Sequence, residues 1–354
     1  MQRSEARRGR GACSNPANRY EAHHVETFDD GWGSSEELPP LNRELVRDTS
    51  RSVITRNDSP DVPFRQSINP YRDCEHGCIY CFARPSHAWL GYSPGLDFET
   101  RLHWKPDAAM RLREELARPG YRCQPIALGI NTDGWQPIER EFGISRALLE
   151  VLCEARHPVS IVTKSALIER DVDLLAELAR DGLVQVNVSL TTLDRRLARR
   201  MEPRAAAPQR RLRVIERLAT QGIPVGVLIA PVIPFLTDSE LEALLDAAHA
   251  AGAHEAGYVL LRLPHEVGPL FDEWLAVHYP ERRERVLARI RDSRGGRLYD
   301  SRFGHRMVGE GPFAELIAAR FRKRYRALGF PGLPPLRCNK FRAPSPSGQL
   351  GLFD

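Results

Sequence analysis

The amino-acid sequence predicts an α/β fold, a partial (β/α)6 barrel of the TIM type, with an irregular N-terminal arm and a basic helical C-terminal extension. Two observations lead to this prediction. Short aliphatic and β-branched runs alternate with helical stretches from about residue 65 to residue 280, and several of those stretches end in glycine directly before the next run. Because parallel strands are buried on both faces, they appear as nearly continuous apolar runs. A doubly wound sheet is the alternative, and in either arrangement ligands bind at the carboxyl ends of the strands.

Six strands and four of the intervening helices follow from this pattern. The expected strands are SINPY (67–71), PIALGI (125–130), VSIVTK (159–164), LVQVNVSL (183–190), PVGVLIAP (224–231) and AGYVLLRLP (256–264). Residues 144–155, 171–182, 210–222 and 238–252 carry apolar residues at steps of three and four and are expected to form helices. The barrel is therefore assigned to residues 61–280, between an arm (1–60), a basic helical extension (281–343) and a flexible tail (344–354).

Composition limits the possible classes of protein. Of the 354 residues, 42% are hydrophobic and 27% are charged, which is typical of a soluble globular protein. No run of about 18 apolar residues is present, and the N-terminus lacks the apolar core of a secretory signal. The seven cysteines show no disulfide-framework spacing. A reducing, cytoplasmic location is expected.

Positive charge is concentrated near the C-terminus. Residues 281–343 contain 17 lysines and arginines against six acidic residues, which gives this region a formal net charge of +11. Since the whole chain has a net charge of +5, the rest of the chain carries about −6. Only four of the 51 basic residues are lysines, which indicates a coding bias towards arginine. The region is therefore either a solvated helical surface inflated by that bias or a surface that binds the phosphates of DNA or RNA. The regional asymmetry favours the second interpretation.

Three cysteines follow the first expected strand at a distinctive spacing. Cys74, Cys78 and Cys81 lie in the loop DCEHGCIYCFARP, whereas Cys13, Cys123, Cys153 and Cys338 are isolated in the sequence. A structural zinc site usually adds a second pair of cysteines or histidines, and His76 within the loop is a poor candidate for a fourth ligand. An iron–sulfur cube uses one thiolate per iron, so three thiolates leave one iron open to an external ligand.

The spacing Cys-x-x-x-Cys-x-aromatic-Cys, with Tyr80 as the aromatic residue, resembles the radical S-adenosylmethionine (SAM) superfamily. The resemblance implies a 4Fe–4S cluster held by the three cysteines and SAM bound to the fourth iron. It also implies reductive cleavage of SAM to a 5′-deoxyadenosyl radical, with an electron donor such as a flavodoxin. A zinc site or a purely structural cluster is the alternative.

Polar residues at later strand ends are candidates to contact SAM. Thr132 and Asp133 follow the second strand, Lys164 ends the third, and Ser189 and Thr191 share one face at the end of the fourth. Asp133 could accept a hydrogen bond from the SAM amino group or simply cap a turn. Lys164 could meet a SAM oxygen or pair with a buried acid, and the two hydroxyls suit ribose, although threonine is also a common strand residue. Arg204 could clamp the SAM carboxylate or form a local salt bridge.

The motifs SINPYRDCEHGCIYCFARP, NTDGWQPIE, VTKS and EPRAAAP look like the spore photoproduct lyase-like branch of that superfamily, over roughly residues 40–265. The resemblance implies that Tyr80 lies near adenine and that Thr132, Asp133, Lys164 and Ser189 contact SAM. The lyase returns hydrogen through a cysteine and tyrosines. Here Asn131 occupies the cysteine position and Phe82 follows the third cluster cysteine. Lyase activity itself is therefore not expected.

The C-terminus ends in SPSGQLGLFD, and the residues Gln349, Leu350, Leu352 and Phe353 resemble the short peptide that docks bacterial DNA-processing proteins onto the sliding clamp. A terminal apolar segment that packs on its own domain is the alternative.

The leading hypothesis is a radical SAM enzyme that acts on nucleic acid in repair or modification. A second hypothesis is a nucleic-acid-binding or clamp-binding protein whose cluster is structural or senses redox state. A third keeps the radical chemistry with a protein or small-molecule substrate.

Overall fold

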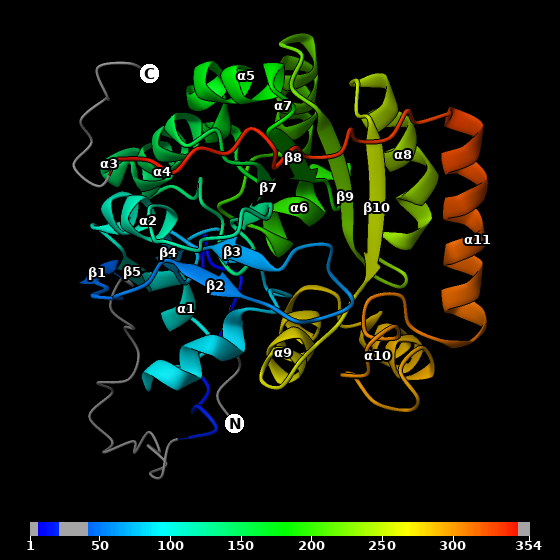
Figure 1. Ribbon diagram of the computed structural model, residues 1–354. Helices are drawn as coiled ribbons and strands as arrows, with labels where there is room; N and C mark the ends of the chain where they lie inside the picture. The colour runs from blue at the N-terminus through cyan, green and yellow to red at the C-terminus, as the bar shows by residue number, and fades with distance from the viewer. Residues whose placement is uncertain (1–5, 21–41, 346–354) are drawn as a thin grey trace, which may run out of the picture.

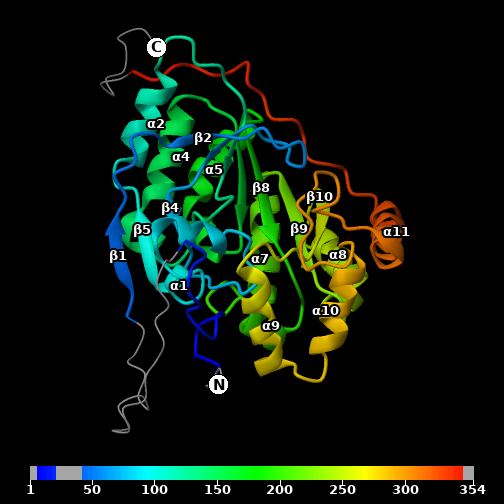
Figure 2. The same cartoon turned by 90° about the horizontal axis from the view of Figure 1, so that it is seen from below.

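A seven-stranded, strongly curved sheet forms the centre of the molecule, in the order β10-β9-β8-β7-β6-β3-β2 (Figures 1 and 2). We analysed a computed structural model, which describes residues 6–20 and 42–345. Six strands are parallel, and β2 (Ile54–Arg56) pairs antiparallel with β3 (Gln66–Ile68). Because the sheet ends at β10 and β2, it is a partial barrel, as the sequence predicts.

The parallel strands lie where their apolar runs place them. β3 is shorter than the expected SINPY strand because Pro70, which lacks an amide proton, follows directly. The other five parallel strands are β6 (Ile126–Leu128), β7 (Val159–Thr163), β8 (Val184–Ser189), β9 (Val225–Val232) and β10 (Glu255–Leu260).

Helices between these strands cover the outer face of the sheet (Figure 2). The four expected helices are α4 (Ile144–Glu154), α5 (Val172–Arg180), α7 (Pro208–Thr220) and α8 (Leu241–Ala250). The remaining helical elements are η1 (Arg84–Leu90), α1 (Asp97–Thr100), α2 (Ala108–Leu116), α3 (Glu139–Phe142), η2 (Ala166–Asp171), α6 (Arg195–Met201), η3 (Asp238–Glu240), α9 (Val267–His278), α10 (Arg283–Asp292) and α11 (Gly311–Leu328). None of these helices is long and apolar enough to cross a membrane, within the residues that the structure describes.

The N-terminal arm contributes two strands to the fold. Besides β2, the strand β1 (Glu44–Arg47) pairs with β5 (Arg101–Trp104) in a small second sheet that also contains β4 (Tyr71–Arg72). The sequence pattern did not reveal this sheet, because its strands have only two to four residues and, in β1, mostly exposed side chains. Most of the other described residues of the arm are irregular, as expected.

Polar contacts join segments near the two edges of the partial barrel. The loop between β2 and β3 carries Asp61, whose carboxylate lies 2.5 Å from the guanidinium of Arg306 and accepts a hydrogen bond from the Gly304 amide. Met307, next to Arg306, accepts a hydrogen bond from the amide of Leu260 at the end of β10. The C-terminal extension thus links the β10 edge to the β2 edge.

The last described residues cross the amino ends of the strands, as the red trace in Figure 1 shows. The amides of Gly332, Arg337 and Arg342 bond to carbonyls of His254, Gly182 and Ala155. The same course brings Cys338 next to Cys123, and burial together with this neighbour raises the pKa of the Cys123 thiol to about 12. Their proximity depends on the tertiary path of the chain, which no local sequence pattern records.

Seven of the 17 basic residues in 281–343 form ion pairs within the protein. Arg320 and Arg324 on α11 pair with Glu242 and Asp246 on α8. Other pairs in the extension are Arg283–Asp272, Arg302–Asp300, Arg306–Asp61 and Lys340–Asp181. Complementarity between a basic extension and acidic barrel helices therefore accounts for part of the regional charge asymmetry.

Candidate functional site

The loop at residues 73–82, called the cysteine loop below, follows β3 and the short strand β4 at the carboxyl end of the sheet. Cys74 and Cys78 are buried, Cys81 is half-buried, and all three are free thiols. The loop turns at Gly77, which has a φ of +64°. A Cβ atom there would lie 2.7 Å from a carboxylate oxygen of Glu99, so both the backbone angle and the available space require glycine.

The spacing of the three thiols differs from that of a mononuclear metal site. Two thiolates on one tetrahedral zinc ion would lie about 3.8 Å apart, given Zn–S bonds of about 2.3 Å. Among the described residues, the one trio of ligand atoms within 4.8 Å of one another belongs to Asp300, His305 and Glu310, and the cysteines are not part of it. The wider arrangement fits one thiolate per iron of a cubic cluster.

Buried Glu99 and Arg84 hold the cysteine loop and the N-terminal arm together. The Glu99 carboxylate accepts hydrogen bonds from the amides of Gly11 and Ala12 and from the guanidinium of Arg84. Arg84 is fully buried and also donates to the carbonyl of Cys78. The N-terminal arm is therefore packed against the loop that holds the three thiols.

Residues 132–136, which follow β6, form hydrogen bonds to the start of the cysteine loop. The Gln136 side chain accepts a hydrogen bond from the Glu75 amide at 2.7 Å and donates to the Asp73 carbonyl at 3.2 Å. Thr132 donates its hydroxyl proton to the same carbonyl. This contact gives Thr132 a role in positioning the residue directly before Cys74.

Asp133 occupies the turn between β6 and the following helical segment. Its carboxylate accepts hydrogen bonds from the Thr163 hydroxyl (2.8 Å), the Trp135 amide (2.9 Å) and the Lys164 amide (2.7 Å). His76 lies 3.4 Å from the same carboxylate, and burial lowers the pKa of its imidazole to about 4. These contacts match the turn-capping alternative for Asp133.

The hydroxyl of Tyr80 belongs to a buried polar network centred on Glu202. The carboxylate of Glu202 accepts hydrogen bonds from the Tyr80 and Thr191 hydroxyls and forms an ion pair with Arg211. Burial opposes ionisation of Glu202, but Arg211 and Lys164 outweigh it and lower the pKa of the carboxyl group to about 2. Burial and Glu202 raise the pKa of the Tyr80 hydroxyl well above its ordinary value. Tyr80 is therefore neutral and held in place.

Lys164 lies at the carboxyl end of β7, with its ammonium 6.0 Å from the centre of the Tyr80 ring. Burial favours its neutral form, but Cys78 and Glu202 outweigh burial and raise the pKa of the amine. No carboxylate lies within ion-pair distance of the ammonium, in the part of the chain that the structure describes. The charged group is thus next to the cysteine loop without a direct salt bridge.

The remaining candidates lie around the same strand ends. Ser189 ends β8, is buried, and accepts a hydrogen bond from Arg211 through its carbonyl. Arg204 forms the local salt bridge that the sequence left open, at 3.2 Å from the buried carboxylate of Glu75. The structure therefore brings every predicted site residue to the carboxyl end of the sheet.

Sequence reasoning missed the residues that hold this arrangement together, above all Glu99, Arg84 and Arg211. Their partners are distant in the sequence or separated by an irregular turn, and buried arginines give no periodic signal. The fully buried side chains of Arg84 and Arg211 are identified by their burial and hydrogen bonds alone.

Residues 68–248, just over half of the chain, match the family model of the Radical SAM superfamily. The chain belongs to this superfamily. Its cofactors are accordingly a 4Fe–4S cluster and SAM, and the free, widely spaced thiols of the cysteine loop fit such a cluster.

Relatives and solved structures extend this result. An uncharacterized protein of Mycobacterium tuberculosis is 41% identical over 222 residues, which is 62% of this chain and 65% of that protein. The match thus spans less than two thirds of the relative's length. A probable GTP 3′,8-cyclase of Methanopyrus kandleri is 31% identical over 44% of this chain and 43% of its own. The fold is similar to that of spore photoproduct lyase complexed with dinucleoside spore photoproduct, with a TM-score of 0.60 and 14% identity over 81% of this chain and 80% of that one.

The two residues that distinguish this chain from the lyase relay are both exposed. Phe82 is 38% exposed, and the guanidinium of Arg262 lies 4.3 Å above its ring. The backbone amide of Asn131 donates a hydrogen bond to the side-chain oxygen of Asn69. The four residues of the predicted clamp-binding peptide, 349–353, lie outside the described residues.

Proposed function

We propose that this protein is a radical SAM enzyme that cleaves SAM reductively and abstracts hydrogen from a nucleic-acid substrate. The observation that carries the proposal is the cysteine loop, which presents three free thiols at the carboxyl end of six parallel strands. When bound there, the cluster supplies the electron that breaks a carbon–sulfur bond of SAM.

In this proposal Cys74, Cys78 and Cys81 each hold one iron. Lys164 offers a charged ammonium to a SAM oxygen, because it has no direct salt bridge among the described residues. The Tyr80 ring faces adenine, and Ser189 and Thr191 lie at the ribose side.

Thr132, Asp133 and Arg204 take part in a different way. Their polar groups are already bonded to the Asp73 carbonyl, to three donors around β7, and to Glu75. We therefore assign them to positioning the loop and the strand ends around SAM rather than to a charge-pairing contact with it.

Nucleic acid is the substrate class that the available observations favour. The lyase of similar fold is described in complex with a dinucleoside photoproduct, and exposed arginines gather near the carboxyl end of the sheet. Splitting of that photoproduct is not proposed, since an amide at Asn131 and a phenyl ring at Phe82 cannot donate a hydrogen atom as a thiol or phenol does.

The proposal is tested by anaerobic reconstitution with iron and sulfide, reduction, and measurement of 5′-deoxyadenosine with and without DNA or RNA. Wild-type protein should form 5′-deoxyadenosine, and nucleic acid should stimulate it. Serine in place of any cysteine of the loop should abolish both the cluster and the product, whereas Cys153→Ser, which changes a half-buried cysteine on α4, should leave both intact.

Two results would contradict the proposal. If no 5′-deoxyadenosine forms and DNA binding survives loss of the loop cysteines, the protein is a nucleic-acid-binding protein with a structural or redox-sensing cluster. If the product forms but neither DNA nor RNA affects it, the substrate is a protein or a small molecule.

A further inference from the structure

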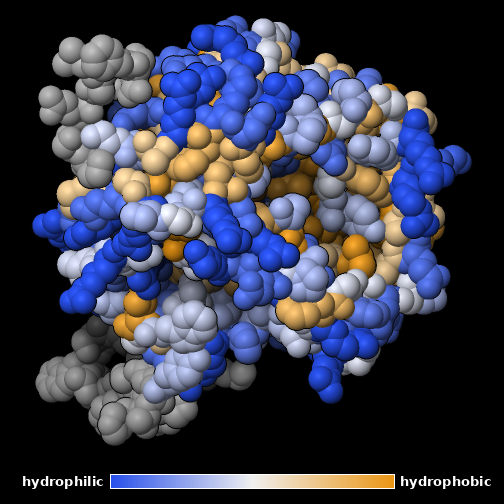
Figure 3. Space-filling view, in the orientation of Figure 1, coloured by the Kyte–Doolittle hydropathy of each residue, from blue (hydrophilic) through white to orange (hydrophobic). Residues whose placement is uncertain are grey.

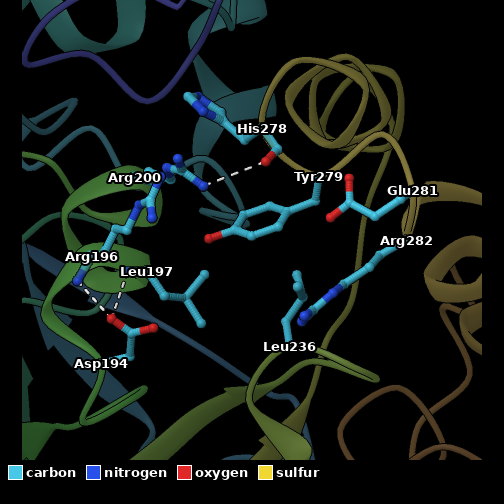
Figure 4. A pocket seen from close by; sticks show the side chains of 9 residues that line it. All are labelled: Asp194, Arg196, Leu197, Arg200, Leu236, His278, Tyr279, Glu281 and Arg282. Atoms are coloured by element: carbon cyan, nitrogen blue, oxygen red, sulfur yellow. Dashed lines mark hydrogen bonds between the residues drawn. The ribbon is translucent and has the colours of Figure 1, made fainter.

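A pocket of about 400 Å³ opens between α6, the end of α9 and the segment that leads into α10 (Figure 4). The ring of Tyr279 lies across the middle of this pocket, with Leu197 and Leu236 facing it from one side. We call it the arginine pocket, because three guanidinium groups, those of Arg196, Arg200 and Arg282, line it.

Three consecutive strands place these residues. α6 follows the carboxyl end of β8, Leu236 follows β9, and α9 with the segment 279–282 follows β10. The pocket therefore lies at the same end of the sheet as the cysteine loop, where ligands bind in folds of this kind.

None of the three arginines, of which Arg200 is half-buried and Arg196 and Arg282 are exposed, has a carboxylate partner among the described residues. Arg283, the next residue in the chain, pairs with Asp272. Arg200 and Arg282 instead donate to the carbonyls of His278 and Phe235. Within the described ranges, no ion pair involves Arg196, Arg200 or Arg282.

Two acidic residues also line the pocket, but one of them is already engaged. Asp194 caps α6, and its carboxylate accepts hydrogen bonds from the amides of Arg196 and Leu197. Glu281 is exposed. Each guanidinium has five N–H donors, so most of those in the pocket remain available to an anion.

Aromatic rings alternate with the arginines along this surface. The guanidinium groups of Arg200 and Arg282 lie 5.1 Å and 6.0 Å from the centre of the Tyr279 ring. Arg282 also borders a second cavity of about 340 Å³, where Arg285 lies 4.7 Å from the centre of the Phe235 ring. Stacking on the rings holds the guanidinium groups in place and reduces the entropy that they lose on binding an anion.

The pocket is coupled to the cysteine loop through one hydrophobic core. Leu197 and Leu236 pack in the same cluster of buried residues as Cys78, Ile79 and Tyr80. The Ile79 amide also donates to the carbonyl of Met201 at the end of α6. A strand held in the pocket would thus be fixed relative to the three thiols.

We propose that the arginine pocket binds the phosphodiester backbone of a nucleic-acid strand and orients it towards the cluster. Planar guanidinium groups pair bidentately with phosphate, and alternating arginine and aromatic residues are typical of surfaces that bind single strands. This inference rests on the proposed nucleic-acid substrate and names the surface that binds it.

The test compares two triple variants of the full-length, reconstituted protein. One is Arg196→Ala/Arg200→Ala/Arg282→Ala in the pocket. The matched control, Arg322→Ala/Lys323→Ala/Arg326→Ala, removes the same charge from exposed positions on α11. Binding of a fluorescein-labelled single-stranded DNA oligonucleotide is followed by anisotropy as the salt concentration rises, and iron content and melting temperature check the fold.

The pocket variant is expected to bind about tenfold or more weakly, and its slope of log affinity against log salt should fall by about 2, or about 0.7 per lost phosphate contact. The α11 variant should keep the wild-type affinity to within about twofold. Equal losses in the two variants, or a wild-type slope in the pocket variant, would overturn the assignment of the pocket while leaving the proposed function in place. If the wild-type protein forms 5′-deoxyadenosine but binds no nucleic acid, both the substrate class and the pocket assignment fail.

Figure 3 shows one face of the protein, in which a hollow with an apolar floor and a hydrophilic rim opens. If the arginine pocket holds the strand, a footprint of the bound oligonucleotide by cross-linking should include Tyr279 and not residues of α11, and the reverse footprint would contradict the proposal.

Discussion

Replacing Glu202 with glutamine should destabilise the fold strongly, because this carboxylate is the counter-charge of the buried Arg211 and also acts on the half-buried Lys164. Glu202 is 2% exposed and Arg211 is 1% exposed. Glu202 pairs with Arg211, accepts hydrogen bonds from Tyr80 and Thr191, and acts electrostatically on Lys164. The variant keeps the shape of the side chain but leaves the positive charges of Arg211 and Lys164 uncompensated.

The magnitude follows from the pKa of the carboxyl group. It falls from an ordinary value of 4.5 to about 2 in the folded protein. At about 1.36 kcal/mol per pKa unit, this difference corresponds to about 3 kcal/mol of the free energy of unfolding. Loss of one partner of a buried ion pair typically costs about 3–5 kcal/mol, which agrees with this value.

The pH dependence gives the prediction a second signature. Because the pKa of Glu202 is lower in the folded than in the unfolded chain, its contribution is fully present above about pH 4.5 and is lost as the pH falls towards about 2. The difference in stability between wild type and Glu202→Gln should therefore be constant from neutral pH to about pH 5 and then shrink as the solution is acidified.

Urea unfolding of the full-length protein, prepared without iron and followed by circular dichroism, measures this difference. Glu242→Gln, which breaks a half-buried surface pair with Arg320, is the matched control and should cost no more than about 1 kcal/mol. The double variant Glu202→Gln/Arg211→Met should lose less than the sum of the single losses, since it removes both charges. A loss below about 1 kcal/mol for Glu202→Gln at neutral pH, or strict additivity in the double variant, would refute the reasoning.

Two further predictions concern contacts between distant segments. Gly11→Ala would place a Cβ atom 1.8 Å from the Gly77 carbonyl, so the arm should detach from the cysteine loop and the reconstituted cluster should be lost faster in air. Gly257→Ala, whose Cβ would make an ordinary 3.6 Å contact, is the control, and equal rates of iron loss in the two variants would contradict the prediction. Because Cys338 lies next to Cys123 in the fold, mild oxidation with diamide should link the two thiols, as peptide mass spectrometry would detect. Finding these two cysteines only in other linkages, or both still reduced, would show that the C-terminal segment does not lie where the structure places it.

Local sequence patterns were sufficient for the order of the elements and for the cysteine loop. A parallel strand buried on both faces must be apolar along its length, so β6 to β10 are visible as continuous runs in the sequence. The three cysteines are close in the sequence, and their spacing alone indicates one open iron. The short strands β1, β4 and β5 carry too few residues for such a pattern.

The surroundings of the loop could not be predicted in this way, because they depend on pairs that are distant in the chain. Glu202 meets Tyr80 across 122 residues, and Gly11 meets Glu99 across 88. Arg204 illustrates the same limit. The sequence left open a SAM contact or a local salt bridge, and only the fold shows that the Glu75 carboxylate lies 3.2 Å from the Arg204 guanidinium.

The sequence by itself thus determined the parallel partial barrel and the superfamily, and it predicts the three cysteines as cluster ligands, since each depends on patterns of residues that are close in the chain. Only the tertiary structure decided which charges are free. It pairs Arg320, Arg324 and Lys340 of the basic extension with acidic residues of the barrel, and it leaves three arginines around Tyr279 without a carboxylate partner among the described residues. The physical reason is that a charge becomes available to a ligand only when folding places no counter-charge beside it, and a count of charges along the chain does not contain that information.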